Sequence, residues 1–221
     1  MIYKILEIIS KLLALMIVLP LHEFAHAFVA VRFGDVTPKL YKRYTINPLA
    51  HFDLIGLASF ALVGFGWAKP VPINPNNFKR YKLGCFCVSV AGVVANILTA
   101  FLVFPLFLLA SRYVPEFGYF TYVLDCTLLL IFQFSIIFFV FNLLPFYPLD
   151  GFRVVDALSR KKGKIYCFLK NYGQIILLSL VALSLVAEFT NLYYLDVLGF
   201  VLNFFYDHIS IPIVNFWGLI F

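Results

Sequence analysis

The chain has few charged residues for its length. Asp, Glu, Lys and Arg make up only 13% of its 221 residues, whereas 63% are hydrophobic. Soluble domains contain about a quarter charged residues and about half apolar ones. This shortage of charge excludes a water-soluble globular protein. We expect an all-α polytopic membrane protein with about four to six transmembrane helices.

The sequence also has few cysteines and no evident cleavage site after its first apolar segment. The chain has four scattered cysteines, which we expect to be apolar packing residues: Cys85, Cys87, Cys126 and Cys167. No small-residue cleavage site follows the first apolar segment, so we expect that segment to remain in the mature protein. Residues 1–221 are expected to form one membrane domain, with a core at 12–160 and C-terminal helices at 172–221.

The basic residues are concentrated in two segments. The net charge is +6, with eight Lys or Arg in residues 32–82, six in 153–170 and only Arg112 in 111–121. Basic connections between membrane helices face the cytoplasm. This rule accounts for the positive charge without a nucleic-acid partner. We therefore expect a multi-pass protein of the cell membrane, surrounded by the lipid bilayer, with both basic segments on the cytoplasmic side.

Hydropathy predicts the membrane-spanning segments. We expect spans at about residues 12–33, 83–110, 122–144 and 172–189, and one more span or a surface helix within 192–221. Between the first two spans, residues 34–82 are rich in proline and basic side chains. Thr45–Pro48 and Val71–Pro75 resemble short extended pieces broken by proline. We expect a short β or re-entrant region there, with backbone buried in protein or facing water.

The polar centre of the first apolar segment predicts a metal site. Residues 22–26 read His-Glu-Phe-Ala-His, an H-E-x-x-H pattern. On a helix, His22 and His26 lie one turn apart on one face and can bind one Zn²⁺, with Glu23 beside them as a general base. Ionisable groups are costly inside a membrane and usually functional there.

A catalytic zinc takes three protein ligands and leaves one position open. Asp150 is the best third ligand among the remaining acidic residues, because it follows two prolines that break the third span. Pro145 and Pro148 can turn the carboxylate inward, and Gly151 lets the backbone pass closely. His51 lies in the connection after the first span, and its part in such a site is left open by the sequence.

These motifs resemble those of the site-2 protease family of intramembrane zinc metalloproteases. The resemblance spans about residues 12–160 and rests on H-E-F-A-H in the first span and on N-L-L-P-F-Y-P-L-D-G at 142–151. The loop G-F-G-W-A-K-P-V-P-I-N at 64–74 resembles the small bacterial branch. We find no stretch for a PDZ domain or a CBS pair.

The resemblance implies roles for individual residues. His22, His26 and Asp150 match the metal ligands, and Glu23 matches the catalytic glutamate. Asn142 and Asn96 match family asparagines that could donate a hydrogen bond to an oxyanion or bind substrate. The residue three before Asn96 is usually proline in the family, and here it is Val93.

The expected function is therefore a zinc endopeptidase that cuts peptide bonds in or near transmembrane segments of membrane proteins. Two other classes remain open. A metal or solute transporter would also place His, Glu and Asp at membrane depth, although we find no internal repeat typical of transporters. An inactive relative would bind membrane proteins without cutting them, and the intact Glu23 speaks against it.

Overall fold

The computed structural model describes residues 1–63, 66–159 and 161–221. Gly64 and Phe65, the first two residues of the loop that resembles the bacterial branch, lie outside this description. Within the described residues all regular structure is helical. The all-α prediction is therefore confirmed for this part of the chain.

In the described part of the chain, four helices are long and apolar enough to cross a membrane. They are α5 (Tyr81–Tyr113), α6 (Tyr119–Leu143), α8 (Lys164–Thr190) and α9 (Val197–Gly218). A membrane core of about 30 Å needs about 20 helical residues, and each of these helices exceeds that length. The chain is thus a multi-pass membrane protein, and α9 is the candidate for the uncertain last span.

Helix α1 (Ile2–Arg32) contains the expected first span but is not one of the four candidates. It packs against both α5 and α6. Ala14 and Val18 of α1 are fully buried and contact Ile131 of α6. This helix therefore hides much of its apolar face in protein and also carries the polar H-E-x-x-H residues. Its crossing of the membrane stays a prediction.

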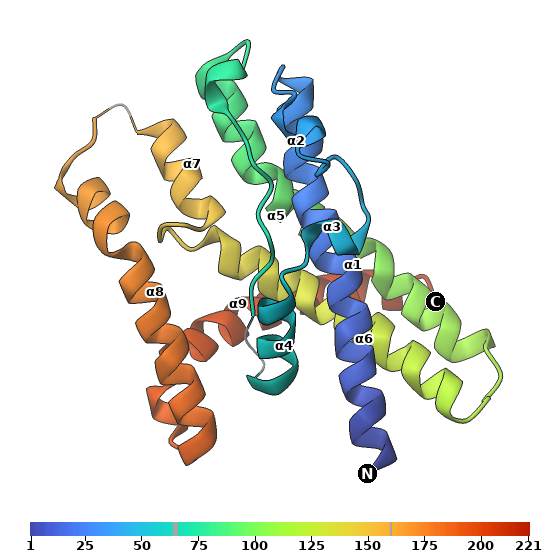
Figure 1. Cartoon of the computed structure of the whole chain (residues 1–221). Coiled ribbons are helices and arrows are strands. Elements are labelled where there is room, and N and C mark those ends of the chain that lie inside the picture. Colours follow the sequence, from blue (N-terminus) through green and yellow to red (C-terminus); the bar gives the residue numbers. More distant parts are fainter. Residues whose placement is uncertain (64–65, 160) are drawn as a thin grey trace.

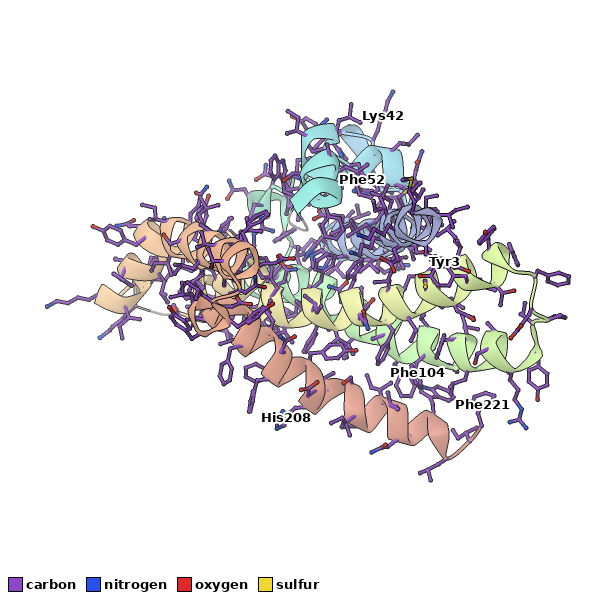
Figure 2. All side chains as sticks on the ribbon, turned by 90° about the horizontal axis from the view of Figure 1, so that it is seen from below. Tyr3, Lys42, Phe52, Phe104, His208 and Phe221 are labelled. Atoms are coloured by element: carbon purple, nitrogen blue, oxygen red, sulfur yellow. The ribbon has the colours of Figure 1, made fainter. Side chains whose placement is uncertain are left out.

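The two helices α5 and α6 form the middle layer of the molecule. Seen from below, α1 lies on one side of them and α9 on the other (Figure 2). The contact with α9 is a cluster of apolar side chains from all three helices: Ala100, Phe104, Phe132, Ile136 and Ile213. Helix α8 contacts α9 and α7 (Asp150–Leu158) at the edge of this layer (Figure 1).

The expected β structure between the first two spans is wrong for the described residues. The segment instead forms α2 (Thr37–Leu40), α3 (Pro48–His51), α4 (Leu54–Val63) and the short 3-10 helix η1 (Pro75–Asn77). A single bridge between Phe52 and Ala68 is the only β pairing in the described chain. Pro70, Pro72 and Pro75 lack the N–H groups that a longer ladder needs, and Pro48 instead begins a helix.

The two basic segments lie at the same end of the molecule. The α1–α2 corner, the beginning of α5 and the α7–α8 connection all lie at the top of Figure 1. The sparsely charged α5–α6 connection and the N-terminus lie at the opposite end. This is the arrangement that a positive-inside topology requires.

A buried carboxylate ties the extended chain before α5 to the end of α1. Asp35 is fully buried and accepts hydrogen bonds from the backbone N–H of Asn74 at 2.7 Å and from Nδ2 of Asn77 at 2.8 Å. It also accepts from the backbone N–H of Thr37 at 3.0 Å. Burial raises the pKa of Asp35, but these hydrogen bonds outweigh it and hold the pKa below its ordinary value.

We predict that Asp35→Asn destabilises the protein by about 1–3 kcal/mol near neutral pH, because one carboxylate oxygen loses its role as an acceptor. The folded pKa of Asp35 lies below the unfolded value of about 3.9, so this contribution is complete above that value and is lost as pH falls through the folded pKa. Thermal unfolding in detergent between pH 3 and 7 measures the effect, since the gap between wild type and variant should narrow toward acid.

The matched control is Asp53→Asn. Asp53 also accepts backbone hydrogen bonds, from Ile55 and Gly56 at the start of α4, both at 3.0 Å. Asparagine serves nearly as well as aspartate in such a helix cap. Asp53→Asn should therefore change the melting temperature little. An Asp35→Asn deficit that does not vary with pH would contradict the role given to the Asp35 charge.

Candidate metal centre

Helix α1 presents two buried imidazoles to the interior. His22 and His26 are 6% and 3% exposed, and their ring centroids lie 4.7 Å apart. Their Nε2 atoms are separated by 3.1 Å. The one-turn spacing predicted from the sequence therefore brings both Nε2 atoms to one point.

Asp150 reaches the same point from the start of α7. The chain folds back sharply after α6, so that α7 begins directly against the end of that helix. A Cβ at Gly151 would lie 2.5 Å from the carbonyl oxygen of Leu144 and would collide with that of Leu143. Glycine is thus required for this close approach. The result places Asp150, only 5% exposed, beside the two histidines.

The three side chains form a compact triangle of possible ligand atoms. Oδ2 of Asp150 lies 3.3 Å from Nε2 of His22 and 2.9 Å from Nε2 of His26. Zinc–ligand bonds of about 2.0–2.1 Å in a tetrahedron place ligand atoms roughly 3.3 Å apart. These three buried residues can therefore hold one metal ion.

The chemistry of the donor atoms also fits a cation. Oδ2 of Asp150 is buried, and its polar neighbours are the two Nε2 atoms of His22 and His26. Burial raises the pKa of the Asp150 carboxyl, but the neighbouring imidazoles of His26 and His22 lower it by more, so its pKa lies well below the usual range. The carboxylate is thus ionised at neutral pH, as a metal ligand must be. Two imidazoles with one carboxylate are a ligand set found in zinc hydrolases.

Helix α5 backs the histidine pair. The backbone carbonyl of Val88 accepts a hydrogen bond from Nδ1 of His26 at 2.7 Å. The side-chain amide of Asn96 lies 3.1 Å from Nδ1 of His22. Between them, a Cβ at Gly92 would collide with Nε2 of His26 and lie 2.7 Å from Nε2 of His22. The helix therefore touches the imidazoles directly at a residue with no side chain.

Glu23 lies beside the triangle and is held by the extended chain. Its Oε2 accepts a hydrogen bond from the backbone N–H of Val71 at 3.0 Å. The same segment is fixed at its two ends, where the N–H of Lys69 donates to the carbonyl of His51 at 2.7 Å and Asn74 donates to Asp35. The carboxylate next to the metal ligands is thus oriented by a segment anchored on both sides.

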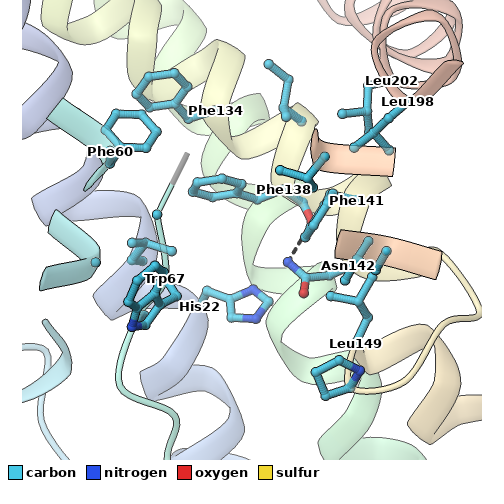
Figure 3. A pocket seen from close by; sticks show the side chains of 18 of the residues that line it. His22, Phe60, Trp67, Phe134, Phe138, Phe141, Asn142, Leu149, Leu198 and Leu202 are labelled. Atoms are coloured by element: carbon cyan, nitrogen blue, oxygen red, sulfur yellow. Dashed lines mark hydrogen bonds between the residues drawn. The ribbon is translucent and has the colours of Figure 1, made fainter. Parts of the chain in front are cut away.

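His22, Glu23, His26 and Asp150 line one cavity of about 1040 Å³. Figure 3 shows His22 among the side chains of this cavity. Most of its wall is apolar and comes from residues 56–60 and 66–73 and from α6, α8 and α9. The labelled apolar side chains are Phe60, Trp67, Phe134, Phe138, Phe141, Leu198 and Leu202. His22 points into this space toward Asn142. The triangle therefore forms a polar end of a largely apolar chamber.

The two predicted asparagines lie in different places. Asn142 is on the cavity wall, and its Nδ2 donates to the carbonyl of Phe138 at 3.0 Å. Asn96 is 1% exposed and contacts His22. His51 is fully buried, with Nε2 donating to the carbonyl of Thr45 at 2.7 Å, and is not among the residues that line the cavity.

The sequence interpretation missed two residues at the site. Gly92 lies within the expected second span, and nothing in the sequence marks it as the residue that meets the histidines. Arg153 lines the cavity, with Nη1 3.6 Å from Oδ1 of Asp150. Its spacing of three residues from Asp150 at the start of a helix could have identified it.

Comparison with known proteins gives one informative match. The chain is 41% identical over 147 residues to "Putative zinc metalloprotease YwhC" of Bacillus subtilis (strain 168), and the aligned part covers 66% of this chain and 67% of that protein. The chain matches no protein-family model and no solved structure. Because the match is this close over two-thirds of the relative, the chain belongs to the family of small site-2 protease-like proteins that includes YwhC.

Proposed function

We propose that this protein is a membrane-embedded zinc metalloendopeptidase that hydrolyses peptide bonds in or near transmembrane segments. The observation that carries the proposal is the buried triangle of His22, His26 and Asp150 with Glu23 beside it, at one end of an apolar cavity. The name of the Bacillus relative supports zinc as the metal. Residues 1–221 act in this proposal as a single membrane domain.

In the proposed site, Nε2 of His22, Nε2 of His26 and a carboxylate oxygen of Asp150 hold the ion. A bound zinc ion supplies Lewis acidity, which makes a water molecule acidic near neutral pH and polarises a peptide carbonyl. Glu23 takes a proton from the attacking water and delivers it to the nitrogen of the leaving amine. The Val71 N–H keeps the Glu23 carboxylate pointed at the cavity.

Other residues of the cavity would receive the substrate. The side-chain amide of Asn142 is on the wall and can donate to the oxyanion that forms on the scissile carbonyl. A transmembrane helix hides its peptide bonds, so the substrate must unwind locally before cleavage. The extended chain at 70–74 lines part of the cavity, and we propose that it holds the unwound segment by strand addition, chiefly through its carbonyl groups. Pro70 and Pro72 have no N–H, and the N–H groups of Val71 and Asn74 already bind Glu23 and Asp35.

The proposed topology places the site toward the cytoplasm. The basic α1–α2 corner, the beginning of α5 and the α7–α8 connection share one end of the molecule (Figure 1). His26 is within two turns of the end of α1 at Arg32, and Asp150 begins α7, so both lie toward that end. A substrate cut here would release its product on the side of the basic connections.

The first test compares wild type with Glu23→Gln. Both proteins would be purified at full length, loaded with zinc and reconstituted with single-pass membrane proteins that carry Gly and Pro in their spans. We expect the variant to bind zinc as wild type does but to cleave about 10²–10⁴-fold more slowly, because its amide cannot take a proton. Product formation by mass spectrometry and zinc content by elemental analysis are the measurements.

The matched control is Glu7→Gln on the same helix, where the carboxylate accepts a hydrogen bond from Tyr122 far from the cavity. It should cleave at the wild-type rate. Equal cleavage rates for wild type and Glu23→Gln would show that Glu23 is not the general base. Metal uptake into vesicles that depends on Glu23, with no product from any substrate, would favour a transporter instead.

A second prediction concerns the contact between α5 and the histidines. Gly92→Ala adds a methyl group where Nε2 of His26 and Nε2 of His22 lie, so the imidazoles or the helix must move. We expect zinc affinity to fall about 10–100-fold, as for other changes around metal ligands. Gly163→Ala is the control, because a Cβ there meets no atom within 4 Å. Unchanged zinc affinity in Gly92→Ala would refute the proposed ligand geometry.

A further inference from the structure

The two histidines of the proposed site are supported by unlike partners. Nδ1 of His26 faces the carbonyl of Val88, which can only accept a hydrogen bond. The proton of neutral His26 is therefore on Nδ1, and Nε2 keeps its lone pair. Nδ1 of His22 instead faces the carboxamide of Asn96, a group that offers both a donor and an acceptor.

The orientation of this carboxamide decides the tautomer of His22. The structure places the amide nitrogen of Asn96 3.1 Å from Nδ1 of His22. In this orientation the amide donates, so the proton of neutral His22 must be on Nε2. The Nε2–H of His22 could then donate a hydrogen bond to Nε2 of His26 or to Oδ2 of Asp150, but a protonated Nε2 cannot bind a cation. With the amide turned by about 180°, its oxygen accepts from Nδ1–H, and Nε2 is free.

We propose that Asn96 is a positioning residue that sets the tautomer of His22: its carboxamide oxygen accepts the Nδ1 proton, which leaves the Nε2 lone pair for the metal ion. This inference rests on the proposed function and assigns Asn96 a role other than oxyanion binding. Asn96 is 1% exposed and is not among the residues that line the cavity, so His22 rather than substrate is the group within its reach.

Burial makes the choice between the two orientations consequential. The side chain of His22 is 7% exposed, so water cannot readily replace the amide as the partner of Nδ1. A buried donor left without an acceptor costs about 1–3 kcal/mol. In the rotated orientation, the Asn96 oxygen accepts the Nδ1 proton of His22, so the metal-binding tautomer does not pay this cost. Asn96 therefore strengthens metal binding although it does not contact the ion.

Two substitutions of Asn96 test whether its side chain acts as a hydrogen-bond acceptor or as a donor toward His22. Asn96→Asp keeps the shape and offers only acceptors, whereas Asn96→Leu offers neither. We expect Asn96→Asp to bind zinc at least as tightly as wild type. We expect Asn96→Leu to bind it about 10–100-fold more weakly. The measurement is the zinc dissociation constant of the full-length protein in detergent, by competition with a chelating dye.

Asn142→Leu is the matched control, because it makes the same chemical change on the cavity wall. It should leave zinc affinity unchanged while it slows cleavage. Nitrogen-15 NMR of histidine-labelled, zinc-loaded wild type gives an independent reading, and we expect a protonated Nδ1 on His22. Far-ultraviolet circular dichroism of each variant reports whether the helices remain folded.

The opposite pattern would overturn the inference. If Asn96→Asp loses zinc affinity as Asn96→Leu does, the amide acts as a donor. If Asn96→Leu keeps wild-type zinc affinity and only turnover falls, Asn96 serves the oxyanion. Zinc binding that survives His22→Ala would refute the metal site itself and the proposed function with it, so the two failures are told apart.

Discussion

The packing of α5 on the imidazole pair of α1 is the contact on which the rest of the site depends. Polar side chains inside an apolar protein are stable only when each finds a partner. Val88 and Asn96 supply those partners from one helix, and Gly92 between them allows the approach. A bulkier face on α5 would hold the helices apart, and the two Nδ1 atoms would lose their hydrogen bonds. The geometry of the candidate metal site is thus a consequence of helix packing.

A second constraint acts on the connection between α1 and α5. Asp35, Glu23 and the carbonyl of His51 each accept a hydrogen bond from the backbone of residues 69–74. Extended backbone at membrane depth needs such partners, because lipid offers none. Glu23 of α1, Asp35 just after that helix and His51 of α3 provide these partners, so the wall of the cavity and the orientation of the proposed general base are fixed together. This coupling explains why an irregular, proline-rich connection can form a defined surface.

Hydropathy and motif spacing predicted much of this arrangement, for physical reasons that differ between residues. The membrane spans follow from long apolar runs, and the His22–His26 pair follows from helical periodicity. Asp150 could be chosen because prolines and a glycine around it mark a sharp reversal of the chain. The expected β structure failed because extended conformation does not ensure a pairing partner, and the prolines remove the donors. The role of Gly92 could not be predicted from the sequence, because it depends on which residues of another helix this glycine contacts.

The side of the imidazole pair that α5 covers has an implication for how the ion comes and goes. The helix backbone lies on one side of the imidazole pair and Asp150 on another, and the cavity adjoins all three side chains. If the cavity is the entry route, the ion and the peptide would reach the site by the same path. In the proposed enzyme the cation would then bind before the peptide, and a bound peptide would keep it in place until the products leave. The ion would then dissociate only from protein without bound peptide. When metal is scarce, molecules without substrate would lose activity before those with substrate bound.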